Sequence, residues 1–334
     1  MSKQLSKITL GICLSLGLWG AASAQTEMRL SISVAQNSHQ GVAIDTFAKE
    51  VEQRTAGRYK IKTFYNGALG GERESIEAVQ LGTQELAFSS SGPVPNFVPE
   101  TKILDIPFLF RDKAHARGVL DGPIGQELLA KFDSKGFKAL AWAENGFRHV
   151  TNNKRAVNSP EDLKGLKLRT MENPIHLAAW KALGCNPTPM AFGELFTAMQ
   201  QGTVDGEENP LGIITGNSFQ DVEKYCVLSE HVYSPYYVVM NLDVYNSMAP
   251  ELQEALNKAM DEATWYQYEQ SQKYEDEAVG VMEAAGMTVI TLTPEQKAEF
   301  KTAVDGADCV SMAKELMANP NLADTMVAEL EAAR

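Results

Sequence analysis

The sequence predicts an α/β fold with two domains and one long helix that lies across both of them. Three observations lead to this fold class. The chain of 334 residues is longer than one hydrophobic core usually supports. Segments with the polarity of strands alternate with segments that have the polarity of helices, as in a sheet covered by helices. Beyond Pro250 the pattern becomes that of one long helix.

The first third of the chain alternates strands and helices. Strand-like apolar patterns and the helical spacing of apolar residues give the expected elements. The expected strands are 29–35, 59–65 and 85–90, and the expected helices are 40–55 and 71–82. This β-α-β-α-β order predicts a parallel sheet with helices on its faces.

The middle of the chain continues this alternation. A helical stretch is expected between 112 and 133, a strand begins at Phe137, and the same alternation repeats over 160–240. Ser159 followed by Pro160 is a favourable helix start, because serine caps the first turn and proline fits the first helical position.

Residues after Pro250 predict one continuous helix. No helix breaker occurs before Gly280 or Gly286. The apolar residues at helical spacing are Leu252, Leu256, Ala259, Met260 and Ala263. Because a helix of about 30 residues spans roughly 45 Å, we expect it to brace both domains.

The first 24 residues have the layout of a secretory signal peptide. Lys3 and Lys7 precede the apolar run 8–19, and small residues at 22–24 suit cleavage before Gln25. No later apolar run reaches the roughly 18 residues that a membrane helix needs. We therefore expect an exported chain that begins near Gln25.

Charge and cysteine content narrow the possible partners. The net charge is −13, and removal of 1–24 leaves 28 basic and 43 acidic residues, a net charge of −15. Such a surface repels nucleic acid and anionic lipid. Cys185, Cys226 and Cys309 lack the spacing of a disulfide framework or a zinc site. We expect no metal and no cofactor.

No catalytic motif is present, so a non-enzymatic function is expected. The chain has no GxSxG, HExxH or GxxxxGK[ST] motif, and no GxGxxG follows a strand. The acidic residues Asp205, Glu207 and Glu208 allow two interpretations. They are either a general acid and base set, as in an exported hydrolase or lyase, or a solvated turn around Gly206, which we favour.

Two arginines are candidate ligand-binding residues. Arg169 lies at the carboxyl end of the short strand 166–170, which is the edge where open α/β sheets bind ligands. Arg148 lies in a strand that leaves an expected turn at Asn145-Gly146. Each arginine alone is also compatible with a surface ion pair. Together, with the amide of Asn209 as a further donor, they favour a carboxylate clamp.

Several fragments resemble one protein family along nearly the whole mature chain. They include NSHQGVAIDTFAKE, NGALGGERESIEAVQLG, ENGFRHVTNNKR, SPEDLKGLKLRTMENP and QQGTVDGEENPLG. The chain is identified by them as a member of the DctP family, the periplasmic solute-binding proteins of tripartite ATP-independent periplasmic (TRAP) transporters. The resemblance implies two α/β domains with mixed sheets that close around a ligand like a flytrap. Domain I would comprise 25–146 and 235–274, and domain II 147–234 and 275–334.

The resemblance also implies roles and partners. Arg169 would form the main ion pair with a ligand carboxylate, and Arg148 and Asn209 would complete the clamp. The partners would be an organic-acid anion and the small and large membrane subunits of the transporter, with an ion gradient driving uptake. The protein would work in the periplasm, and we expect a monomer.

The rest of the ligand site is inferred from residues at strand and helix ends. His39, Glu72 and the segment Ser90–Gly92, with Ser91 at its centre, would face the arginine pair on closure. Glu72, with His39 and Asn173, suits a hydroxylated ligand, although Glu72 also fits a purely structural role at a helix N-terminus. Phe192 is either a wall of the site or a core residue.

These residues favour a sugar acid as the ligand. A dicarboxylate would need a second basic contact, for which His39 is the obvious candidate. We therefore expect a uronate, such as D-glucuronate or D-galacturonate, or an aldonate. A C4-dicarboxylate, a short branched hydroxy or keto acid, and a role as a periplasmic sensor subunit are the alternatives.

Overall fold

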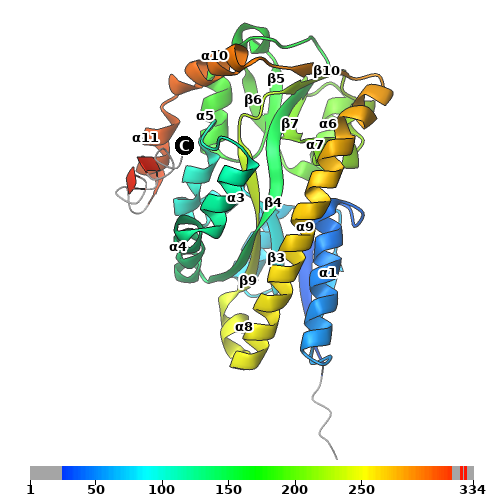
Figure 1. Ribbon diagram of the computed structural model, residues 1–334, viewed down its shortest axis with the longest axis vertical. Helices are drawn as coiled ribbons and strands as arrows, with labels where there is room; N and C mark the ends of the chain where they lie inside the picture. The colour runs from blue at the N-terminus through cyan, green and yellow to red at the C-terminus, as the bar shows by residue number, and fades with distance from the viewer. Residues whose placement is uncertain (1–24, 318–323, 326, 329–334) are drawn as a thin grey trace, which may run out of the picture.

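The computed structural model describes residues 25–317, 324–325 and 327–328, so the predicted signal peptide lies outside the described residues. The strands follow the order β2-β1-β3-β9-β4-β7-β5-β6, with β8 joined to β4 and β10 to β8. Helices lie on both faces of this curved sheet (Figure 1). Within the described residues, no helix is long and apolar enough to span a membrane.

The elements have the following bounds. The strands are β1 (Thr26–Ile32), β2 (Tyr59–Phe64), β3 (Leu86–Ser90), β4 (Phe137–Asn152), β5 (Lys167–Thr170), β6 (Asn186–Pro189), β7 (Gly206–Pro210), β8 (Tyr225–Leu228), β9 (Tyr233–Asn241) and β10 (Thr288–Thr291). The helices are α1 (His39–Arg54), α2 (Glu72–Gln80), α3 (Lys113–Asp121), α4 (Pro123–Lys131), α5 (Pro174–Ala182), α6 (Phe192–Gln200), α7 (Leu211–Gly216), α8 (Leu242–Ser247), α9 (Pro250–Ala284), α10 (Pro294–Asp305) and α11 (Cys309–Leu316).

The predicted β-α-β-α-β order of the first third is confirmed. Strand β1 pairs in parallel with both β2 and β3. Ser38 caps α1 by accepting a hydrogen bond from the backbone N–H of Gly41, and Gly57, at a φ of +74°, lies in the turn that follows the helix. Strand β3 is antiparallel to β9, so the sheet is mixed. The helix expected to start at Ser159 is a 3-10 helix, Pro160–Leu163, with a capping box.

Strand β4 is the longest strand and connects the two halves of the sheet. Its residues 137–147 pair with β9, and its residues 148–152 pair with β7. The prediction of a turn at Asn145-Gly146 is therefore wrong. The chain continues through this dipeptide with a shift of register, and Gly146 adopts a φ of +115°, a conformation that glycine tolerates.

Helix α9 confirms the predicted long helix. It has 35 residues and runs past α1 and β4 toward the end that carries β10 (Figure 1). Two of its side chains hold β4 near the register shift. Gln267 accepts a hydrogen bond from the backbone N–H of Glu144 at 2.9 Å, and Ser271 donates to the carboxylate of Glu144 at 2.7 Å. The domain boundaries stay a prediction.

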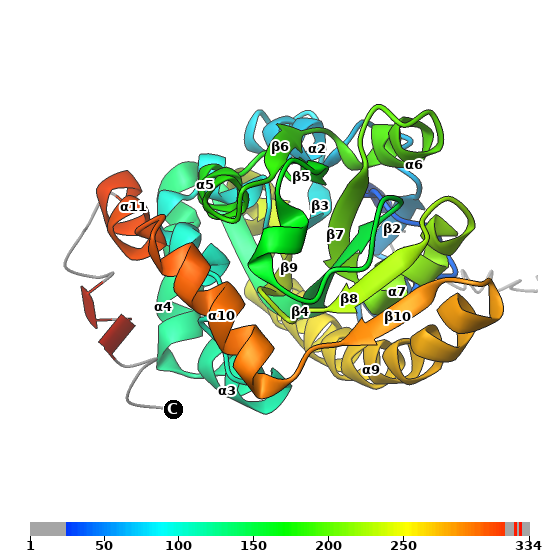
Figure 2. The ribbon, with the colours of Figure 1, turned by 90° about the horizontal axis from the view of Figure 1, so that it is seen from above.

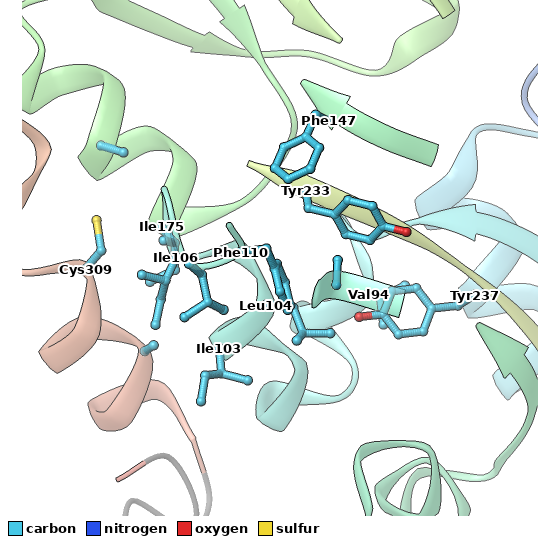
Figure 3. Close-up of a cluster of buried hydrophobic side chains, with 14 of the residues drawn as sticks. Val94, Ile103, Leu104, Ile106, Phe110, Phe147, Ile175, Tyr233, Tyr237 and Cys309 are labelled. Carbon is cyan, nitrogen blue, oxygen red and sulfur yellow. The ribbon is translucent and has the colours of Figure 1, made fainter. Parts of the chain in front are cut away.

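Among the described residues, the buried apolar side chains form two clusters. Figure 3 shows part of one of them, in which side chains from distant segments pack together. The rings of Phe147, from β4, and Tyr233, from β9, meet edge to face at 5.3 Å. Tyr233 also donates its hydroxyl to Glu144 at 2.9 Å. The middle of β4 is thus fixed by both apolar and polar contacts.

Candidate functional site

Two adjoining cavities are lined by residues of or beside β5, α2 and α6. Figure 2 shows these three elements from above. The inner cavity has about 270 Å³ of empty space, and the outer one about 350 Å³. They share Glu72, Arg169, Met171 and Phe192. The inner cavity is completed by Ser33, Ser90, Asn145, Asn209, Ile213 and Tyr236. The residues that line the inner cavity are thus widely separated in the sequence, from Ser33 to Tyr236.

Arg169 lines both cavities and has no acidic partner among the described residues. Its side chain comes from β5 and is only 3% exposed. Its Nε and Nη2 atoms donate to the backbone carbonyl of Met190 at 3.0 and 2.8 Å. No Asp or Glu oxygen lies within 4.0 Å of its guanidinium in the part of the chain that the structure describes. Burial is the main cause that lowers the pKa of Arg169 from its ordinary value. A carboxylate in the cavity would supply the missing counter-charge.

Arg148 is fully buried and already ion-paired. Its Nε lies 2.5 Å from Oε2 of Glu208, and its Nη2 lies 3.0 Å from Oε1 of the same residue. Glu208 also bonds Nε2 of His231 at 3.0 Å. The Nη1 atom of Arg148 has no hydrogen-bond partner among the described residues. Arg148 does not line the cavities, but it touches the site through Asn209, whose Oδ1 accepts from Nη2 at 3.2 Å.

Asn209 lines the inner cavity from the buried strand β7. Its amide nitrogen donates to Glu207, and Glu207 also accepts from the hydroxyl of Thr151 at 3.0 Å. The expectation of a solvated turn around Gly206 is wrong, because all five residues of β7 are buried. A Cβ at Gly206 would lie 2.1 Å from the carbonyl oxygen of Thr151, so this close strand pairing requires glycine.

Glu72 and Phe192 lie at the first positions of α2 and α6. The carboxylate of Glu72 accepts from the backbone N–H of Ser90 at 3.0 Å, from its hydroxyl at 2.5 Å, and from the hydroxyl of Ser33 at 3.2 Å. It is therefore both fixed in place and present at the cavity wall. Phe192 lines both cavities while its ring packs 6.0 Å from that of Phe219.

His39, Ser91 and Asn173 do not line these cavities. His39 bonds Gln267 at 2.8 Å, and burial lowers its pKa to about 3. Ser91 and Ser234 share a hydrogen bond of 3.1 Å. Asn173 caps α5 and donates its amide to Asp105 at 2.7 Å and to the carbonyl of Gly92 at 3.3 Å. Their polar groups are therefore used in contacts within the protein.

Five residues of the inner cavity are absent from the predicted site. They are Ser33, Asn145, Met171, Ile213 and Tyr236. The predicted segment Ser90–Gly92 contributes Ser90 to the cavity. Ser33 and Ser90 lie at the ends of parallel strands, a position that signals a ligand site. Tyr236 lies inside β9, stacked on Phe88 at 4.6 Å, where no local sequence signal marks it.

Comparison with known proteins gives one consistent result. The family described as bacterial extracellular solute-binding protein, family 7 (DctP), matches residues 30–308. A solute-binding protein of Verminephrobacter eiseniae is 63% identical over 291 residues, which cover 86% of each chain. The crystal structure of a TRAP periplasmic solute-binding protein from Polaromonas sp. JS666, bound to D-erythronate, has a TM-score of 0.87 and 44% identity. It covers 92% of this chain and 99% of that chain.

A second solved structure has a similar degree of likeness. It is a TRAP periplasmic solute-binding protein from Bordetella bronchiseptica, whose ligand density was interpreted as pantoate. The two chains are 43% identical, with a TM-score of 0.85 and coverage of 91% of this chain and 99% of that chain. The predicted mixed α/β solute-binding fold is confirmed by these similarities.

Proposed function

The chain belongs to the DctP family of TRAP periplasmic solute-binding proteins, and on that premise we propose that it captures a short hydroxylated monocarboxylate through Arg169. This family binds solutes and is not enzymatic. Arg169 carries the proposal, because a guanidinium that is 3% exposed and has no acidic partner among the described residues borders the cavity. Two N–H···O bonds to one carboxylate would neutralise it.

Asn209 and Arg148 would complete the clamp. Asn209 uses one amide hydrogen on Glu207, so its second amide hydrogen is available to the ligand. Arg148 orients Asn209 by donating to its Oδ1. In this arrangement Arg169 supplies most of the attraction, whereas Arg148 acts mainly by holding its neighbours in place.

The remaining walls favour hydroxyl groups on one side and carbon atoms on the other. Glu72, Ser33 and Asn145 offer acceptors and donors for ligand hydroxyls, whereas Phe192 and Ile213 offer apolar surface.

These features rank the acids expected from the sequence. D-erythronate and pantoate, which are reported for two similar structures, are both short hydroxylated monocarboxylates. His39, the basic residue considered for a second carboxylate, lies outside the cavity. A short aldonate or branched hydroxy acid is therefore preferred to a uronate, and a C4-dicarboxylate comes last.

The proposed role is delivery of this acid to the membrane subunits of a TRAP transporter. Closure of two domains would be favoured because only the closed state lets Arg169 and Glu72 contact the same ligand. The dependence on membrane subunits follows from family membership.

A thermal-shift screen tests the proposal. The panel contains D-erythronate, pantoate, galactonate, galacturonate and succinate, and a ligand at 100 times its dissociation constant stabilises the fold by about 2.7 kcal/mol. We expect the largest shift with erythronate or pantoate, and none with Arg169→Ala. If no acid shifts the wild-type protein, or if Arg169→Ala responds equally, the proposed clamp is refuted.

A further inference from the structure

Glu207 is a fully buried carboxyl group directly behind the proposed clamp. Both of its oxygens accept hydrogen bonds, one from the amide of Asn209 and one from the hydroxyl of Thr151. No Lys, Arg or His nitrogen lies within 4.0 Å of it in the described residues. Glu207 thus differs from its neighbour Glu208, which has Arg148 and His231 as partners.

Titratable groups on four strands and in the segments beside them surround Glu207. The groups are Arg148 and His149 on β4, Arg169 on β5, Asp205 and Glu208 on or beside β7, and Glu223 and Cys226 before and on β8. Near the cavity, this set contains the two cations Arg148 and Arg169 and the paired anion Glu208. Glu72, at the cavity wall, is a second anion that acts on Arg169, so the two arginines are matched by two carboxylates before a ligand binds.

We propose that Glu207 is a positioning residue of the carboxylate clamp and that it takes up one proton from solvent when the acid anion binds. The inference rests on the proposed function. Once a ligand carboxylate joins Glu208 and Glu72, the anions near the cavity outnumber the two arginines, so an ionised Glu207 would add another unbalanced negative charge in a buried site. Protonation removes this charge.

The hydrogen bonds of Glu207 are compatible with a proton. When the carboxyl group is neutral, its hydroxyl points toward Thr151, which can accept it, and its carbonyl oxygen continues to accept from Asn209. Asn209 therefore keeps its orientation in both states. Glu207 fixes the amide, and its protonation changes only the charge beneath the ligand.

The same surroundings bring the pKa of Glu207 close to neutral pH, where binding can be measured on both sides of it. Burial, first of all, and the charge of Glu208 raise the pKa of Glu207 to about 7, against the bond from Asn209 and the two arginines. An added ligand carboxylate raises this pKa further, so affinity falls as the pH rises through and above the pKa of the free protein. His39 and His149 remain neutral in this range, because burial lowers the pKa of each to about 3.

Calorimetric titration tests the inference with D-erythronate, or with pantoate if that acid gives the larger thermal shift. Binding is measured at about pH 6 and about pH 8, each in two buffers of different ionisation enthalpy, which gives the number of protons taken up. We expect affinity up to about tenfold weaker at the higher pH, with uptake approaching one proton there.

Two variants with the same Glu-to-Gln change test whether Glu207 is the group that takes up the proton. Glu207→Gln keeps an acceptor for Asn209 but cannot titrate, so its affinity should not depend on pH. Glu223→Gln makes the same change at a buried carboxyl group outside the cavity, and burial raises the pKa of Glu223 to about 9. This control should keep the pH dependence of the wild type.

The outcomes separate the two proposals. Tight binding without proton uptake in the wild type, or pH dependence that survives in Glu207→Gln, overturns the role of Glu207 and leaves the proposed function intact. Absence of binding at both pH values refutes the proposed function and this inference together. If Glu207→Gln does not fold, proton uptake by the wild type and by Glu223→Gln still decides.

Discussion

Substitution by methionine should mainly weaken ligand binding at Arg169 and mainly lower folding stability at Arg148. Arg169→Met removes the cation that borders the cavity and keeps a side chain of similar length. Loss of one partner of a buried charge pair costs about 2 to 5 kcal/mol of binding free energy, or roughly 30- to 4,000-fold in affinity. The magnitude should be near the upper end, because Arg169 is 3% exposed and solvent cannot replace it.

The stability of the ligand-free protein should change little in Arg169→Met. The substitution removes a buried charge that has no acidic partner among the described residues, which favours folding, and it removes two hydrogen bonds to the carbonyl of Met190, which opposes folding. These effects offset each other to within about 1 kcal/mol. Arg148→Met instead leaves the carboxylate of Glu208 without its bidentate partner, which costs about 3 to 5 kcal/mol of folding stability.

Urea denaturation of the ligand-free proteins and calorimetric titration with D-erythronate measure the two effects separately. Arg169→Met should unfold at nearly the wild-type urea concentration and bind poorly. Arg148→Met should unfold early. If Arg169→Met is destabilised as strongly as Arg148→Met, then Arg169 is a structural residue and the reasoning about its missing partner fails.

Three further predictions follow from other contacts. Glu72→Gln should weaken hydroxy acids about tenfold and leave unsubstituted acids unaffected in competition titrations, and equal losses would mean that Glu72 does not contact hydroxyls. Gly92→Ala places a Cβ 2.4 Å from Sδ of Met171, which lines the cavity, so affinity should fall, whereas Gly118→Ala, with open space around it, should bind normally. The carboxylate of Glu144 forms an ion pair with Arg117 at 2.8 Å. Burial raises the pKa of Glu144, but Arg117 and Lys113 lower it below the ordinary value of 4.5. Its stabilising effect is therefore lost as the pH falls below about 4.5, and Glu144→Gln should flatten the acid side of a stability curve against pH.

The regular elements were predictable because their signals are local. Helix α1, strand β2 and helix α9 appear within a few residues of the expected bounds, since apolar periodicity and Gly57 or Pro250 define them. Asn145-Gly146 misled the prediction because this dipeptide favours tight turns in isolation. In the folded chain, pairing on both sides of it keeps β4 continuous.

The candidate site was predictable only where its residues lie at the ends of strands or the starts of helices. Arg169 lies near the end of β5 and Glu72 at the start of α2, and both line the cavity. His39 and Asn173 also lie at helix starts, but partners distant in sequence, Gln267 and Asp105, occupy their polar atoms. Nothing in a local pattern shows which polar group is already satisfied across the fold, so such residues look the same as ligand-binding ones.

Strand register explains why, among the described residues, Arg148 has a carboxylate partner and Arg169 has none. Strand β7 is antiparallel to β4, with Val150 opposite Glu208 and Arg148 opposite Pro210, so Glu208 and Arg148 point to the same face and pair. Strand β7 touches β5 in parallel at Leu168 and Gly206, which brings no carboxylate within 4.0 Å of Arg169 among the described residues. A shift of one residue in β7 would exchange the faces of Glu207 and Glu208. The proposed binding of an anion by a chain of net charge −13 thus depends on strand pairing and not on overall composition.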